Sequence, residues 1–310
     1  MTKLVQTLID GVSIGAVYAL LALGYVIIFK ATEVVSFAQG GLLLLGGYFT
    51  WWFQQDGHGM LGFWPALVAG ILLAAAVAVI VERLLVRRMQ SRAAGVVSIT
   101  IMTLGLNLLF TTYVSHGVVN SGAETLSLND PWGLNSVHVG VISIFQTRLW
   151  ALIIGSLIIA TLFLWIQRSS MGVAMRAVAE DREAASLMGI RIGRVSITAW
   201  AIAGALATLA AIFLTAPPSP GFDRGAGDLA LAAFPAAIVG GLDSTTGALA
   251  GGLVIGVSVS LFKSYESDLA VSGFNIFGGG FSDVVPYVVM LLVLLVRPTG
   301  LFGTRMVQRA

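Results

Sequence analysis

The chain has 310 residues, of which 57% are hydrophobic and only 10% are charged, and its formal net charge is +2. A soluble domain normally has about a quarter of its residues charged, so this composition excludes an ordinary soluble enzyme and predicts a membrane protein. Cysteine is absent, which excludes disulfide bonds and thiolate sites. The histidines are scattered, and we expect neither a metal site nor a nucleic-acid partner.

Nine apolar stretches are candidate membrane spans, since a span needs about 20 residues to cross a hydrocarbon core of roughly 30 Å. In chain order they are residues 4–29, 34–53, 61–81, 96–118, 149–167, 196–216, 229–241, 246–262 and 284–296. Residues 1–310 are therefore predicted to form one all-α polytopic membrane domain with about eight to nine transmembrane segments. The seventh stretch, around Pro235, is too short to cross, which predicts a broken or half-length span among other helices.

The basic residues predict the orientation, because loops rich in Lys and Arg stay in the cytoplasm. Placing Lys30, the arginines of 83–92, the loop 168–195 and the C-terminal tail on one side collects most of the 17 Lys and Arg residues. This places the N-terminus outside and the C-terminus in the cytoplasm. The first apolar stretch is predicted to be a retained span and not a cleaved signal peptide.

The loop 168–195 is a charged segment between two predicted spans, so it must lie in water. Residues 174–188 contain no Gly or Pro and are rich in Ala, Met, Arg and Glu, which predicts a short helix that Gly172 precedes and Gly189 ends. Its alanines leave the backbone thinly covered, which suits docking into another protein's groove. Arg176 and Glu180 are spaced to pair on its flank. The alternative is a solvated loop that binds nothing.

Few ionisable residues lie near the middle of any predicted span. Because a charge at the bilayer centre costs at least about 2.5 kcal/mol, this pattern favours a path for a neutral or zwitterionic solute that is powered from elsewhere. Gln39, with glycine beside it, is the strongest candidate for lining the path. The candidates are Ser36, Gln39 and Gly40 in the second stretch, Thr100, Thr103 and Asn107 in the fourth, and Phe234 and Pro235 at a kink in the seventh. For each one, an interhelical hydrogen bond is the alternative role.

The sequence has no Gly-Lys-Ser/Thr phosphate-binding loop, so we expect no nucleotide hydrolysis by this chain. No carboxylate pair, histidine cluster or Ser-His-Asp set can be assembled from residues within the spans, which argues against an enzyme. Energy for transport would have to enter through the loop 168–195.

Several motifs resemble one family of transporters. Glu183-Ala184-Ala185, followed after three residues by Gly189, resembles the EAAxxxG coupling loop of ABC-importer permeases, and AVAEDREAASLMGI is similar to the branched-chain amino acid permeases in particular. The motifs GAVYAL, VVSFAQGG, AAFPAAIVGGLDSTTGALAGG and RPTGLFG resemble the family's shorter permease subunit, over nearly the whole chain. Two positions depart from the pattern: Gly41 replaces the usual acidic residue, and Ala232 replaces a frequent lysine.

The resemblance implies that the loop 168–195 forms a cytoplasmic coupling helix in a cleft of an ATPase subunit and passes its opening and closing to the membrane helices. The residues implied in coupling are Arg176, Ala177, Glu180, Asp181, Glu183, Ala184, Ala185, Gly189 and Ile190.

The implied function is that of a permease subunit of a binding-protein-dependent ABC importer for branched-chain or similar apolar amino acids, in a prokaryotic cytoplasmic (inner) membrane. The implied partners are a second related permease, two ABC ATPase subunits that hold ATP and Mg, and an external or periplasmic solute-binding protein, with no cofactor in this chain. The alternative function is an ATP-independent channel or facilitator for a small neutral solute such as urea or an amide.

Overall fold

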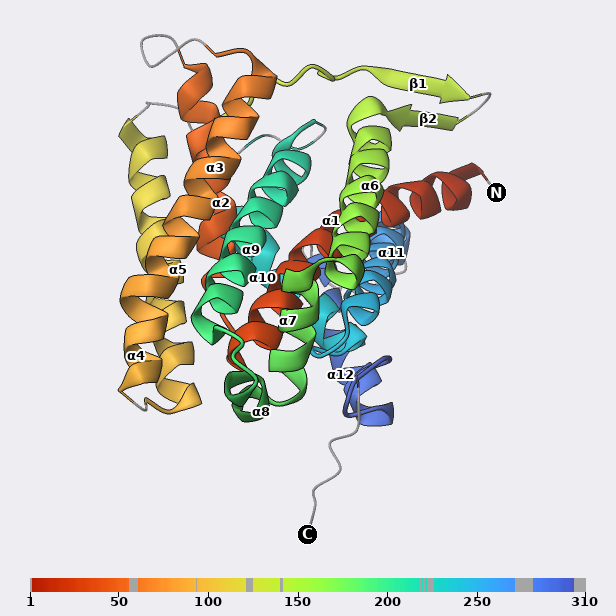
Figure 1. Cartoon of the computed structure of the whole chain (residues 1–310). Coiled ribbons are helices and arrows are strands. Elements are labelled where there is room, and N and C mark those ends of the chain that lie inside the picture. The colour runs from red at the N-terminus through yellow and green to blue at the C-terminus, as the bar shows by residue number, and fades with distance from the viewer. Residues whose placement is uncertain are drawn as a thin grey trace.

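The computed structural model of the chain is almost wholly helical, and it describes residues 2–55, 61–92, 94–120, 125–139, 142–217, 219, 221, 226–270 and 281–303. The elements, labelled in Figure 1, are α1 (Thr2–Thr32), α2 (Gln39–Gln54), α3 (Phe63–Val81), the π-helical turn η1 (Glu82–Val86), α4 (Arg87–Ser91), α5 (Val96–Asn120), β1 (Ser136–Val139), β2 (Ile142–Phe145), α6 (Gln146–Arg168), α7 (Ser170–Glu180), α8 (Arg182–Leu187), α9 (Ile192–Thr215), α10 (Ala226–Gly240), α11 (Thr245–Ala270), the 3-10 turn η2 (Phe281–Asp283) and α12 (Val285–Val296).

Each predicted apolar stretch corresponds to a helix, which confirms the all-α polytopic membrane fold. Among the described residues, 6 helical segments are long and apolar enough to cross a membrane: Lys3–Thr32, Phe63–Ser91, Val96–Gly117, Gln146–Arg168, Ile192–Thr215 and Thr245–Glu266. The other three predicted spans are shorter helices, with 16 residues in α2, 15 in α10 and 12 in α12. Helices of this length fall short of a full crossing and need neighbouring helices around their ends.

Several predicted boundaries differ from the structure, among them the end of the eighth span, which continues to Ala270 in α11 instead of stopping at residue 262. The first helix starts at Thr2 instead of residue 4. The second helix starts at Gln39 instead of residue 34, because Glu33 has a positive φ of 57° and ends α1. Residues 33–38 therefore form a non-helical connection, called here the α1–α2 junction. The predicted half-length span is confirmed as α10, but the predicted break is absent because the helix continues through Pro235. Packed neighbours make a proline tolerable inside such a helix.

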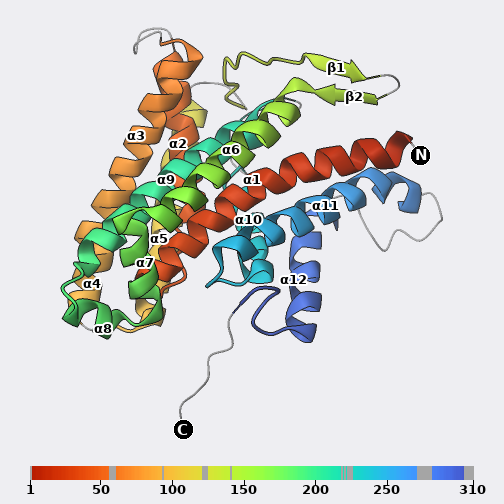
Figure 2. The ribbon, with the colours of Figure 1, turned by 45° about the vertical axis from the view of Figure 1, so that its right-hand side comes forward.

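Helix α1 lies at the centre of the molecule. From Val17 to Ile28 its side chains are nearly all buried, because α9, α11, α6 and α10 pack around it. Helix α2 lies against α3, α5 and α9 and forms the other part of the core. Figures 1 and 2 show α5 at one side of the bundle and α6 along its surface. Leu108 and Leu157, more than half exposed, belong to these outer helices and are suited to contact lipid.

The contact between α1 and α11 is made by glycines. A Cβ atom added at Gly256 would clash with the backbone of Gly15, and one added at Gly252 would lie 2.5 Å from the Cα atom of Ala19. Small residues at such a contact let two membrane helices approach until their backbones touch. This glycine seam holds α1, the longest helix among the described residues, against its principal neighbour.

At the end of the molecule where α3 and α6 begin, β1 and β2 form an antiparallel hairpin that the sequence did not predict, with Ser136 opposite Phe145. Before it, Trp132 is only 4% exposed, and its ring lies 5.2 Å from that of Phe63 and 5.6 Å from that of Phe213. Trp132 thereby packs the connection between α5 and α6 onto α3 and α9.

Candidate coupling loop and translocation path

The predicted basic regions converge at one end of the molecule (Figure 1). Arg182 donates from Nη1 to the carbonyl of Thr32 at 3.4 Å and from Nη2 to Oε1 of Gln90 at 3.0 Å. The Gln90 amide in turn donates to the same Thr32 carbonyl at 3.5 Å. These bonds join α8 to the ends of α1 and α4, so the loop 168–195 shares one end with Lys30 and the 83–92 arginines. That this end is cytoplasmic stays a prediction, and the C-terminal tail beyond residue 303 lies outside the described residues.

The coupling segment is two helices and not the predicted single helix. Asp181 separates α7 from α8 with an extended backbone (φ −154°, ψ 109°). Its Oδ1 accepts hydrogen bonds from the N–H groups of Glu183 and Ala184, both at 2.9 Å, and so caps α8. Ser169 caps α7 in the same way through the N–H of Gly172, which lies inside α7 and not before it. Asp and Ser side chains compete well for such free N–H groups.

Gly189 ends α8, as predicted. Its φ of +84° is the left-handed conformation that favours glycine, and its N–H donates to the carbonyl of Ser186 at 3.0 Å. The next N–H, from Ile190, donates to the carbonyl of Ala185, also at 3.0 Å. These two bonds turn the chain sharply from α8 toward α9.

The exposed surface of the loop differs from the expected alanine face. Ala185 is buried at 3% exposure and Ala177 is half-buried, whereas Leu187 and Met188 are 89% and 83% exposed. The charged and small residues on the exposed side are Arg176, Glu180, Asp181, Glu183 and Ala184. A large apolar pair at the tip of a charged loop is a typical contact surface for a partner protein. This exposed pair was not predicted from the sequence.

The predicted pairing of Arg176 with Glu180 is not what the structure shows. Arg176 Nη2 donates to the carbonyl of Gln167 at 3.3 Å, so this side chain turns back to the end of α6. It ties the beginning of the loop to the preceding membrane helix.

Gln39, the strongest path candidate, lies deep in the bundle. It is completely buried, and its Nε2 donates to the carbonyl of Ala203 at 3.1 Å. Ala203 is halfway along the 24-residue helix α9, so α2 begins near the middle of the bundle's depth. On its other side, the Gln39 amide contacts Gly24 of α1, where a Cβ atom would clash with it.

The α1–α2 junction brings several path candidates together. The N–H of Phe37 donates to Oγ1 of Thr103 at 3.0 Å, which joins the junction to α5. The ring of Phe234 in α10 lies 5.1 Å from that of Phe37 and 5.5 Å from that of Tyr25. Thr100 is less central, because its hydroxyl donates to the carbonyl of Val96 in its own helix. The junction and side chains from α1, α5 and α10 therefore meet at one place.

Three buried oxygen atoms, in the junction, at the start of α2 and in α5, have no hydrogen-bond partner among the described residues: Ser36 Oγ, Gln39 Oε1 and Asn107 Oδ1. Leaving a buried polar group unpaired costs about 1–3 kcal/mol, so each is a position for water or a solute. The first intrahelical bond of α2 is from Leu42 to Ala38, and no side chain caps the helix. The N–H groups of the preceding turn, including Gly40, are thus positioned for an anionic group.

The structure explains why glycine, and not an acidic residue, occupies position 41. A Cβ atom there would lie 2.8 Å from the Cβ of Phe110, so an acidic side chain does not fit unless α2 and α5 move apart. Ala232 is half-buried in α10, two residues before Phe234. Both positions keep the surroundings of the junction uncharged.

The fold is that of an all-α polytopic membrane protein. The model of the family described as "Branched-chain amino acid transport system / permease component" matches residues 7–294. The chain belongs to this family of transport permeases.

Similar proteins cover almost the same length. The chain is 30% identical over 322 residues to the high-affinity branched-chain amino acid transport system permease protein LivH of Salmonella typhimurium, with 98% of this chain and 97% of LivH covered. It is 29% identical over 317 residues to the corresponding protein BraD of Pseudomonas aeruginosa, with the same coverage. A probable LivH of Methanocaldococcus jannaschii is 29% identical over 293 residues, covering 92% of this chain and 88% of that protein. No solved structure matches the chain.

Proposed function

We propose that the chain is a permease subunit of a binding-protein-dependent ABC importer and forms the translocation path for branched-chain or similar apolar amino acids. It pairs with a second related permease and two ATPase subunits, which hold ATP and Mg²⁺, and receives solute from an external binding protein. The observation that carries this proposal is the exposed Leu187–Met188 tip on a loop that Arg182 ties to the end of α1.

The geometry supports a short mechanical connection from this loop to the path. Arg182 holds the carbonyl of Thr32, the last residue of α1, and the α1–α2 junction starts at the next residue. A movement of α8 driven by closure of the ATPase dimer is therefore applied at Thr32, seven residues before Gln39. Rigid-body shifts of this kind are a common way to open a site to alternate sides of a membrane.

The chemistry at the junction suits a zwitterionic solute with an apolar side chain. The free N–H groups at the start of α2 and the partial positive charge of a helix N-terminus favour a carboxylate. The unpaired oxygens of Ser36 and Gln39 accept hydrogen bonds from an ammonium group. The rings of Phe37, Phe234 and Tyr25 offer an apolar surface beside them.

Reconstitution tests the proposed power source. The chain is purified from its native membrane with co-purifying subunits and placed in liposomes with the binding protein and radiolabelled leucine. We expect accumulation of leucine only with ATP inside the liposomes, and none with the chain alone. Passive flux of leucine, urea or an amide through the chain alone would instead support the ATP-independent facilitator and overturn the proposal.

Gly189→Val is expected to lower uptake roughly tenfold while the affinity of the binding protein for its solute stays unchanged. Nothing lies within 4 Å of a Cβ atom at this position, so the cost comes from the positive φ and not from a clash. A left-handed conformation costs roughly 1–2 kcal/mol for most residues but is tolerated by asparagine. Gly189→Asn is therefore the matched control and keeps most of the uptake. Equal loss in both variants would contradict a conformational cause.

Gln39→Leu is expected to lower uptake roughly tenfold or more with little change in stability. Leucine fills a similar volume, so the variant loses only the bond to Ala203 and the free Oε1, and one such bond contributes about 1 kcal/mol. Uptake in cells and thermal unfolding of the purified complex measure the two effects. Gln54→Leu, at the other end of α2, is the control and retains uptake. Wild-type uptake by Gln39→Leu would show that Gln39 only joins α2 to α9.

A further inference from the structure

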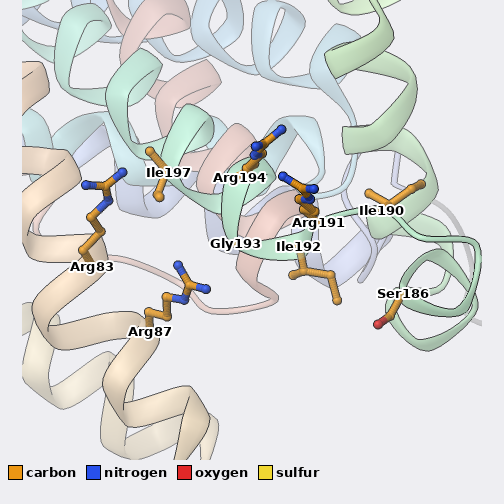
Figure 3. A pocket seen from close by; sticks show the side chains of 9 residues that line it. All are labelled: Arg83, Arg87, Ser186, Ile190, Arg191, Ile192, Gly193, Arg194 and Ile197. Atoms are coloured by element: carbon orange, nitrogen blue, oxygen red, sulfur yellow. The ribbon is translucent and has the colours of Figure 1, made fainter.

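A basic cavity of about 520 Å³ lies beside the coupling loop, between η1, α4 and the start of α9. Figure 3 shows the side chains around it, with Arg83 and Arg87 on one side and Arg191 and Arg194 on the other. The full lining is Arg83, Arg87, Ser186, Ile190, Arg191, Ile192, Gly193, Arg194 and Ile197. Gly193 gives room for one arginine, since a Cβ atom there would lie 2.9 Å from Cζ of Arg87.

The described residues that line the cavity include four arginines and no acid, and the buried carboxyl of Glu82 interacts electrostatically with only two of these arginines, Arg83 and Arg87. No residue in the described part of the chain accepts a hydrogen bond or ion pair from the guanidinium groups of these four arginines. The nearest acid in the sequence, Glu82, is only 1% exposed and does not line the cavity. Four guanidinium groups around one space repel one another, and an anion bound between them removes that repulsion. The planar guanidinium group fits phosphate oxygens in pairs.

The position of the cavity indicates where such an anion comes from. It lies at the end of the membrane-crossing segment Phe63–Ser91, which is the depth of lipid headgroups. On the same segment, Ile80 is 53% exposed and Leu84 is 60% exposed, so acyl chains can cover the helix next to the arginines. Basic pockets at the ends of membrane helices bind the headgroups of anionic lipids.

We propose that this arginine cavity binds the phosphate of an anionic phospholipid, whose acyl chains lie on the exposed apolar side of α3 and η1. The lipid then bridges the membrane end of α3 and the chain that leaves the coupling loop. The proposal depends on neither the transported solute nor the ATPase.

The first test uses the full chain purified in a neutral detergent and native mass spectrometry. Phosphatidylglycerol is expected to remain bound at a concentration at least roughly tenfold lower than phosphatidylcholine with the same acyl chains, and higher salt is expected to reduce the difference. Equal retention of the two lipids would overturn the proposal. So would displacement of phosphatidylglycerol by millimolar inorganic phosphate, because the site would then be one for the free anion.

The second test compares two double variants that remove the same charge. In R87Q/R194Q, the preference for phosphatidylglycerol over phosphatidylcholine is expected to fall by roughly tenfold or more. In R88Q/R92Q, where both arginines are exposed outside the cavity lining, the same preference is expected to stay within about twofold of the wild type. R83Q/R191Q replaces the first variant if that one does not remain monodisperse.

Two results would contradict the lipid assignment. Equal loss in both double variants would point to general charge and not to the cavity. An unchanged lipid preference in R87Q/R194Q, with loss of ATPase binding to the complex, would assign the arginines to acidic side chains of the ATPase.

Discussion

The double substitution of Leu187 and Met188 by aspartate is expected to abolish solute uptake and to release the ATPase subunits from the purified complex. These two side chains are 89% and 83% exposed at the tip of the coupling loop, where no lipid covers them in the proposed orientation. An apolar anchor buried at an interface contributes about 2 kcal/mol or more, so losing each one weakens binding by roughly 30-fold. Co-purification of tagged ATPase and leucine uptake in cells measure the result.

Ser170→Asp is the control for this double variant. Ser170 is exposed at the start of α7 in the same loop, and an acidic residue is favourable in the first turn of a helix. The control variant is expected to keep the ATPase bound and to transport leucine. Normal uptake by the double variant would mean that Leu187 and Met188 do not contact an ATPase subunit. That result would remove the main support for the proposed function.

Gly256→Val is expected to leave almost no folded protein in the membrane. A side chain at this position would clash with the backbone of Gly15 and therefore separate α11 from the buried central helix α1. Overpacking in a close contact costs about 1–3 kcal/mol, and more when backbones must separate. The amount of monodisperse protein after extraction and the melting temperature report the loss.

Gly105→Val tests whether the effect comes from packing and not from valine in a membrane helix. Gly105 is exposed in α5, and a Cβ atom there meets nothing within 4 Å. The control variant is expected to fold and melt like the wild type. Comparable loss in both variants would contradict the role assigned to the glycine seam.

Hydropathy alone predicted the membrane helices but not the start of α2. Residues 34–38 are mostly apolar and continue into the apolar helix, so the sequence suggests one continuous span. The end of α1 at Glu33 and the bond from Phe37 to Thr103, 66 residues away, determine the non-helical junction. Such tertiary hydrogen bonds cannot be predicted from local sequence. The uncharged character of the path candidates could be read directly from the sequence.

The charge of residues 168–195 predicted an exposed, helical loop, and Gly189 predicted where its last helix ends, whereas the coupling role stays a prediction. Asp181 was missed as a break because strong helix formers surround it, although Asp is a favourable N-cap residue. The exposure of Leu187 and Met188 could have been predicted, because the sequence has a large apolar pair directly before a glycine in a charged segment. The contacts of Arg182 could not, because its partners Gln90 and Thr32 lie 92 and 150 residues away.

The backbone contact of α1 with α11 determines which parts of the transporter can rock during a cycle. Helices α1 and α11 touch at Gly15 and Gly256, where no side chain between them can change rotamer. We therefore expect the two helices to move together as one rigid unit. The aromatic and polar contacts between the junction, α5 and α10 have alternative rotamers and can rearrange. The gate is therefore expected on the α5 side of the central helix, away from α11.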